Sequence, residues 1–426
     1  MELTRTFDFT PATQAEPGKL CFNLLLLFVI TLYALPAQLF PVLEVVRPAQ
    51  VIVISALALL VFEKLTRRQS FVLVWPEGYL LLAFGAAAVL STFSAFWPLR
   101  AYEASLDLAR IVLAYFLIVN TVVTEKRLRA FLLAMVVGGL FPAVGALNGY
   151  IHGDLIEGRA HWIGVFGNPN ELAYVLVMLV PLAAVLAARA RYPMRIMLWT
   201  SICLYLAAIY LTFSRGSLLG LFGVVVLLVI RQQGLFLKVA LGLLLAAGLA
   251  FMAASWTRSD GLSNQDYTFQ QRIATIKAGA AMFAAHPFVG VGINCAVVAF
   301  PIYASDDFKH RGALVVHNTI IQALSETGLL GFVPFALLII CGLYHARRVA
   351  RHERSECKPD RAQPSRSDGL QPGGRRMAVG LEISLWGAMI CGLSGGFLLS
   401  WFPYLVVGLI AATRQIAETA QLSSNE

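Results

Sequence analysis

The sequence predicts an all-α, polytopic membrane protein. Of its 426 residues, 58% are hydrophobic and only 13% are charged, whereas a soluble domain is usually about one-quarter charged. Long apolar runs recur along the chain, and the period-2 alternation of a membrane β-strand is absent. Because lipid offers backbone groups no water, we expect these runs to be helices. The chain, residues 1–426, is expected to form a single integral membrane domain.

Twelve apolar runs approach the roughly 20 residues that a helix needs to cross a bilayer. They lie near residues 20–40, 46–63, 77–97, 103–123, 129–150, 170–188, 196–213, 215–231, 236–256, 317–345, 378–398 and 400–414. The second and the last are short, so a tilted, half-buried or re-entrant segment is an alternative at both places.

The distribution of the 33 lysine and arginine residues predicts the orientation of the chain. When the N-terminus is placed in the cytoplasm, most of these residues fall on the cytoplasmic side, loop after loop, as in membrane proteins generally. Both termini are then cytoplasmic. The formal charge of +9 comes mainly from these loops, so we expect no nucleic-acid partner.

Two connections are long, and their compositions differ. Residues 346–377 are rich in Arg, Ser, Pro and Gly, which predicts a flexible basic loop in the cytoplasm. Residues 257–316, on the outer side, contain apolar residues at helical spacing, which predicts an amphipathic helix along the membrane surface. The spaced residues are Phe269, Ile273, Ile276, Ala280 and Phe283.

The outer side retains few basic residues, and three of them are candidates for binding an anion. Arg159 precedes the sixth predicted span, Arg215 lies within a four-residue break, Ser214–Ser217, between two apolar runs, and Arg272 lies on the amphipathic segment. A guanidinium group stays charged when partly desolvated and matches phosphate oxygens in pairs. The alternative is that these arginines snorkel toward water or pair with neighbouring carboxylates.

His317 and Asn318 stand where the long outer loop re-enters the membrane. A neutral imidazole can take a proton from a sugar hydroxyl, which makes His317 the best candidate for a general base. Asn318 could orient a substrate or cap the helix that begins there. The alternative for His317 is a polar residue that faces lipid headgroups.

Two further residues are weaker candidates for substrate contact. His286 precedes a Gly290–Gly292 pair, where a glycine-rich turn could let a ligand approach the backbone, although a structural histidine is favoured. Asn170 follows Asn168 and Pro169 at a predicted helix start, so capping is the first interpretation and substrate contact the second. We find no C-x-x-C pair and no outer Asp-x-Asp motif, and we expect no metal and no cofactor.

Four segments resemble the O-antigen ligase and polymerase superfamily of bacterial envelope glycosyltransferases. They are GRAHWIGVFGNPNELA at 158–173, TFSRGSLLG at 212–220, QQRIATIKAGAAMFAAHPFVGVGIN at 270–294 and HNTIIQALSETGLLGF at 317–332. Their order, with one long outer loop between the ninth and tenth spans, carries the resemblance. It implies a GT-C-like membrane glycosyltransferase in the bacterial inner membrane, with its active site facing the periplasm.

The resemblance also implies partners and a mechanism. The donor would be a glycan linked to undecaprenyl pyrophosphate, the acceptor the lipid A-core, and the surroundings membrane lipid, with the protein acting as a monomer. His317 would deprotonate the acceptor hydroxyl, while Arg215, with Arg159 and Arg272, would hold the departing pyrophosphate, without metal and with inversion. An O-antigen polymerase or a protein O-oligosaccharyltransferase of the same superfamily is the alternative. A membrane transporter is the second alternative.

Overall fold

The protein is a bundle of long helices, and the part of the chain that the structure describes contains no strand. The structure, a computed structural model, describes residues 18–231, 267–310, 314–351 and 372–425. The prediction of an all-α polytopic membrane protein is confirmed. Among the described residues, six helical segments are long and apolar enough to cross a membrane, and two shorter apolar helices accompany them.

Helices occupy the predicted spans, except that the ninth, residues 236–256, lies outside the described residues. The first eight correspond to α1 (Lys19–Ala34), α4 (Pro48–Thr66), α5 (Glu77–Thr92), α6 (Pro98–Thr121), α7 (Glu125–Ile151), α8 (Pro169–Ala187), α9 (Tyr192–Leu211) and α10 (Arg215–Arg231). The last three correspond to α15 (Thr319–Arg351), α16 (Pro372–Gly392) and α17 (Trp401–Asn425). Most of the predicted cytoplasmic loop, 346–377, also lies outside the described residues.

Several helix ends differ from the predictions for local reasons. The helix predicted to reach residue 40 ends at Ala34, because Leu35 adopts a left-handed conformation and Pro36 begins the short α2 (Pro36–Leu39). Another short helix, α3 (Pro41–Val46), precedes α4. The last predicted span, 400–414, is not short: α17 has 25 residues. It continues through the polar residues after Arg414, which a search for apolar runs cannot detect.

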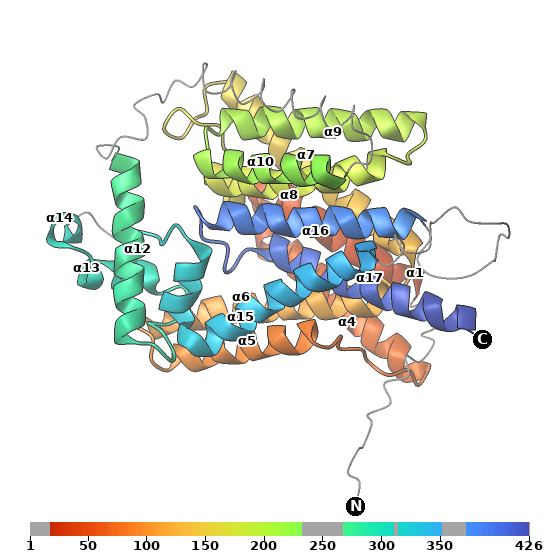
Figure 1. Cartoon of the computed structure of the whole chain (residues 1–426), viewed down its shortest axis with the longest axis horizontal. Helices are drawn as coiled ribbons and strands as arrows, with labels where there is room; N and C mark the ends of the chain where they lie inside the picture. The colour runs from red at the N-terminus through yellow and green to blue at the C-terminus, as the bar shows by residue number, and fades with distance from the viewer. Residues whose placement is uncertain (1–17, 232–266, 311–313, 352–371, 426) are drawn as a thin grey trace, which may run out of the picture.

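The long helices run side by side, and α8 is the most enclosed of the candidate spans (Figure 1). It packs most extensively against α16 and α9, while α15 packs against α5 and α16. At one end of the bundle, α12 (Tyr267–Ala285) runs across the direction of the other helices, with α13 (Ala296–Tyr303) and α14 (Asp306–Lys309) beside it (Figure 1). The placement of this helix along a membrane surface stays a prediction.

The face of α12 that packs on the protein is not the apolar stripe that the sequence indicates. Ala274, Thr275, Ala278 and Met282 are buried, whereas Ile273 is 37% exposed. Small residues allow the helix to approach α15 closely. The apolar stripe through Ile273 is thus partly free to contact lipid. The side chain of Phe269 lies outside the described part.

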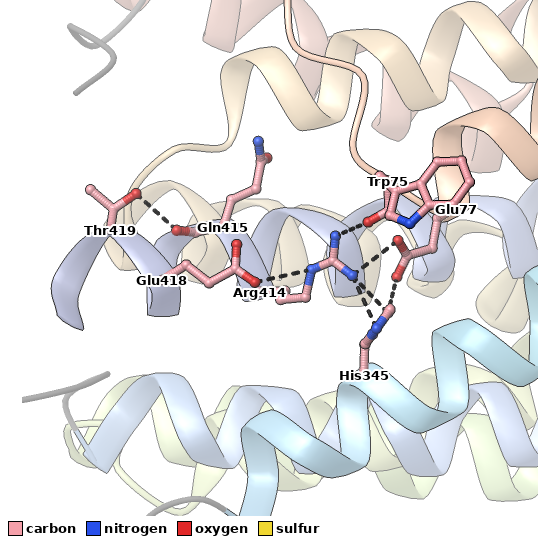
Figure 2. Close-up of polar contacts among 7 residues, drawn as sticks. All are labelled: Trp75, Glu77, His345, Arg414, Gln415, Glu418 and Thr419. Carbon is pink, nitrogen blue, oxygen red and sulfur yellow. Dashed lines mark hydrogen bonds and ion pairs between the residues drawn. The ribbon is translucent and has the colours of Figure 1, made fainter. Parts of the chain in front are cut away.

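The other end of the bundle is held by buried charges. The Glu77 carboxylate on α5 accepts from His345 Nδ1 of α15 at 2.5 Å and lies 3.4 Å from Arg414 Nη1 of α17 (Figure 2). Arg414 also donates to the Trp75 carbonyl, so one guanidinium group joins three segments. A second cluster nearby pairs Glu382 with Arg231 at 2.5 Å. Buried carboxylates of this kind require such partners.

Candidate functional site

The loop before α8 holds Arg159 in a fixed position. The Arg159 side chain is 8% exposed, and its Nε donates to the Thr212 carbonyl at 2.7 Å. Its Nη2 donates to Asn170 Oδ1, also at 2.7 Å. Asn168 caps α8 by accepting from the Asn170 amide at 2.9 Å. Arg159 is therefore fixed between the start of α8 and the turn that leads into Arg215.

Arg215 is the first residue of α10, and its neighbours lie against two other segments. A Cβ atom added at Gly216 would overlap the Ser394 hydroxyl and lie 2.7 Å from the Tyr174 hydroxyl. The preceding residue, Ser214, also interacts with the Tyr174 side chain. The helix start carries the positive end of the α10 dipole, which adds to the guanidinium charge in favouring an anion.

Tyr174 is a residue of this neighbourhood that sequence analysis did not find. Its hydroxyl donates to the Ser394 carbonyl at 3.0 Å and lies 3.1 Å from Ser394 Oγ. Its ring leaves no room for a side chain at Gly395. Ser394 and Gly395 belong to residues 393–400, which connect α16 to α17 and are called the 393–400 loop below. The Ser-Gly-Gly sequence between two apolar runs was the available signal.

The 393–400 loop is bonded in turn to the start of α15. Thr319 Oγ1 donates to the Gly395 carbonyl at 2.8 Å and accepts from the Phe397 amide at 2.9 Å. Gln322 Oε1 accepts from the Leu398 amide at 3.4 Å. The loop therefore bridges α8 and the first turns of α15, which follow His317 directly.

His317 lies two residues before α15 and is partly buried. Burial, and secondarily the nearby Arg272 guanidinium, lowers the pKa of His317 from 6.5 to about 4. Arg272 is also close enough to interact electrostatically with Tyr174. The imidazole is therefore neutral near pH 7 and able to accept a proton.

Asn318 caps α15, and its side chain is engaged by backbone groups. Its Oδ1 accepts from the amides of Ile320 and Ile321, both at 3.0 Å, and its Nδ2 donates to the Leu393 carbonyl at 3.1 Å. Asn170 is similarly engaged with Arg159. These contacts match the capping interpretation of both asparagines, and substrate contact by either stays a prediction.

His286 is held by other partners. Its Nε2 lies 2.9 Å from the Tyr303 hydroxyl, and its ring meets Phe96 edge to face at 5.8 Å. This is the structural role that the sequence favours. The described contacts do not join His286 to the arginines or to His317, and its contact with substrate stays a prediction.

The glycines after His286 allow close approaches within the protein, Gly290 to the backbone of α15 and Gly292 to Ala95. Gly290 has φ of +69°, and a Cβ there would lie 2.6 Å from the Thr327 amide nitrogen. The helix α15 is kinked at Gly328, with φ 57° and ψ −161°. Backbone bonds from the loop replace the helical bonds lost at the kink, which a membrane interior requires. The bonds are Val291 N to Ser325 O at 2.8 Å, Gly292 N to Glu326 O at 3.1 Å, Leu329 N to Pro287 O at 2.8 Å and Leu330 N to Phe288 O at 3.1 Å.

Comparison with known protein families gives one match. A family model described as O-antigen ligase matches residues 196–336, from α9 to the first half of α15. This match supports membership of the chain in the O-antigen ligase superfamily. No curated protein matches the chain.

The region matched by the O-antigen ligase model contains Arg215, Arg272 and His317, whereas Arg159 and Tyr174 lie outside it. Members of the superfamily are glycan ligases and polymerases, which gives this membrane protein a general enzymatic role. Arg159 is bonded to α8 and to Thr212, and Tyr174 contacts the 393–400 loop and Ser214, which precedes Arg215. Arg272 acts electrostatically on both Tyr174 and His317. A neutral base with a cation near it can serve the transfer of a group from a phosphate-linked donor.

Proposed function

We propose that this protein is an O-antigen ligase. It transfers a glycan from undecaprenyl pyrophosphate to a sugar hydroxyl of the lipid A-core, on the periplasmic side of the inner membrane. The observation that carries the proposal is the proximity of Arg272 to a neutral His317, because it joins a candidate base to a candidate pyrophosphate ligand. Both termini would be cytoplasmic, since basic residues such as Arg231, Arg347 and Arg414 lie toward the other end of the bundle.

In the proposed reaction, the unprotonated ring nitrogen of His317 takes the proton of the acceptor hydroxyl. The acceptor oxygen then forms a bond to the anomeric carbon of the donor from the face opposite the pyrophosphate. The bond from that carbon to the phosphate oxygen breaks, and the pyrophosphate leaves with the electron pair, so the anomeric configuration inverts. A positioned base typically contributes about 10²–10⁴-fold to such a step.

The arginines stabilise the charge that develops on the pyrophosphate. Arg159 is fixed by two hydrogen bonds of 2.7 Å, and Arg215 begins a helix whose dipole also favours an anion. Cations that are held in place before the reaction contribute as much as a general base or more. Pyrophosphate is a good leaving group, so the proposed mechanism uses neither a protein acid nor a metal.

Reconstituted vesicles test the proposal. Wild-type protein, given lipid-linked glycan and lipopolysaccharide that lacks O-antigen, should yield a ladder of ligated products in the presence of a metal chelator. His317→Ala and Arg215→Ala should each abolish the ladder. His152→Ala is the matched control, because His152 is exposed at a loop end and, among the described residues, its ring bonds to the Asn148 carbonyl of its own helix.

The same assay separates the ligase from its relatives. A polymerase would lengthen the lipid-linked glycan without using lipopolysaccharide, and a protein-directed transferase would require a hydroxyl on a protein. If both alanine variants ligated at the wild-type rate while normally folded, the assignment of His317 and Arg215 would be wrong.

A further inference from the structure

The Tyr174 hydroxyl lies where segments far apart in the sequence meet. Tyr174 belongs to α8 and is 1% exposed. Its hydroxyl donates to the Ser394 carbonyl, 220 residues away, at 3.0 Å. Ser214, next to Arg215, interacts with the same side chain. The Tyr174 side chain thus links three segments: α8, to which Arg159 is bonded through Asn170, the start of α10, and the 393–400 loop.

Glycines on two of these segments leave space for this phenol. A Cβ at Gly216 would lie 2.7 Å from the Tyr174 oxygen, and a Cβ at Gly395 would overlap its ring and lie 3.1 Å from the oxygen. Any larger residue at either position would push the hydroxyl away from Ser394. The Tyr174 side chain is therefore closely packed against both glycines, as in a protein core.

The bond from Tyr174 reaches the reacting residues in two short steps. Ser394 is followed by Gly395, whose carbonyl accepts from Thr319 Oγ1 at 2.8 Å, and Thr319 is two residues from His317. Arg272, which interacts electrostatically with Tyr174, also lowers the pKa of His317. Tyr174 thus lies near the candidate base His317 and the candidate cation Arg272, but is itself neither a base nor a cation.

We infer that Tyr174 is a positioning residue, whose hydroxyl fixes the 393–400 loop and thereby holds His317 in register with Arg215 and Arg272. The inference rests on the proposed ligase function. Loss of the hydroxyl would leave the ring and the helix intact but release the loop from α8. Catalysis is sensitive to small displacements of this kind, since reacting groups must be held close to their productive geometry.

Tyr174→Phe tests the inference, with Tyr205→Phe as the matched control. Tyr205 is a buried tyrosine on α9 whose hydroxyl also donates to a backbone carbonyl, that of Val136. Hydrogen exchange should quicken at the Phe397 and Leu398 amides in Tyr174→Phe and stay unchanged there in Tyr205→Phe. Ligation by Tyr174→Phe should fall about tenfold, the effect of one hydrogen bond of ordinary strength.

Two further readouts separate positioning from simple stability. The acid limb of the pH–rate profile should move upward in Tyr174→Phe, because a loosened loop admits water to His317 and burial is the main cause of its low pKa. Ser394→Ala should have a smaller effect on the rate, since the main-chain carbonyl that accepts from Tyr174 remains.

The outcomes are distinguishable. Wild-type exchange and a wild-type rate in Tyr174→Phe would overturn the inference, and so would a lower folded yield with unchanged specific activity and acid limb. If wild-type protein formed no ligated product, the proposed function would fail, and the exchange of the 393–400 loop alone would then decide whether Tyr174 fixes that loop.

Discussion

The low pKa of His317 makes a quantitative prediction for the pH dependence of ligation. With a pKa of about 4, His317 remains about 90% neutral at pH 5, whereas an ordinary histidine of pKa 6.5 would be only about 3% neutral there. Lowering the pH from 7.5 to 5 should therefore reduce the rate by only about 10%. The same change would slow a reaction that depends on an ordinary histidine by about 30-fold.

The measurement is the ligation rate kcat/KM in vesicles between pH 4 and pH 8. An acid limb near pH 6.5 would refute the assignment of a buried, neutral His317 as the base. Arg272→Gln should move the limb upward, because it removes the neighbouring positive charge that disfavours the imidazolium. An acid limb at the wild-type pH in Arg272→Gln would show that Arg272 does not lie beside His317.

Stability must be followed in parallel, because the same pKa acts on folding. The unfolded chain binds a proton at His317 near pH 6.5, but the folded protein does so only near pH 4. The folded state therefore loses stability as the pH falls through this window. Melting curves at each pH show whether a fall in rate reflects unfolding.

Three other variants test separate parts of the structure. Gly290→Ala should lower the free energy of unfolding by about 3 kcal/mol or more beyond the effect of Gly153→Ala. Both glycines have positive φ, but of these two only Gly290 faces the α15 backbone. Equal melting temperatures of the two variants would contradict this. Arg159→Lys keeps the charge but should lower kcat/KM of the folded fraction by about tenfold or more, because an ammonium group cannot reproduce the two guanidinium bonds. A wild-type kcat/KM would exclude a role in donor binding. Glu77→Ala should destabilise the protein by about 3 kcal/mol, because it leaves the cations opposite Glu77 unpaired. The specific activity of the folded fraction should stay unchanged, and a selective loss of activity would contradict this prediction.

Local signals in the sequence were sufficient for most of the fold. Apolar runs and the distribution of basic residues report directly on the bilayer, and they gave the helices and their order. Asn168 and Pro169 were identified as the start of α8 because capping depends only on neighbouring residues. Arg159 and Arg215 were expected on one side of the membrane, and the contact of Arg159 with Thr212 brings their segments together.

Contacts between distant segments could not be predicted in this way. Tyr174 lies in an apolar run, where a tyrosine is usually only a packing residue, and its partner is 220 residues away. The Gly290–Gly292 pair indicates a close approach, but no sequence signal says that Gly290 meets the backbone of α15 and Gly292 meets Ala95. Similarly, the left-handed Leu35 that ends α1 is not a residue type expected in that conformation.

The most direct test of the central claim is a structure of the protein with a polyprenyl pyrophosphate bound. The account predicts the pyrophosphate in contact with Arg215 and Arg272, with His317 facing the carbon that would bear the glycan. A pyrophosphate bound beside His286 and Tyr303, or at the end of the bundle that holds Glu77, would contradict it.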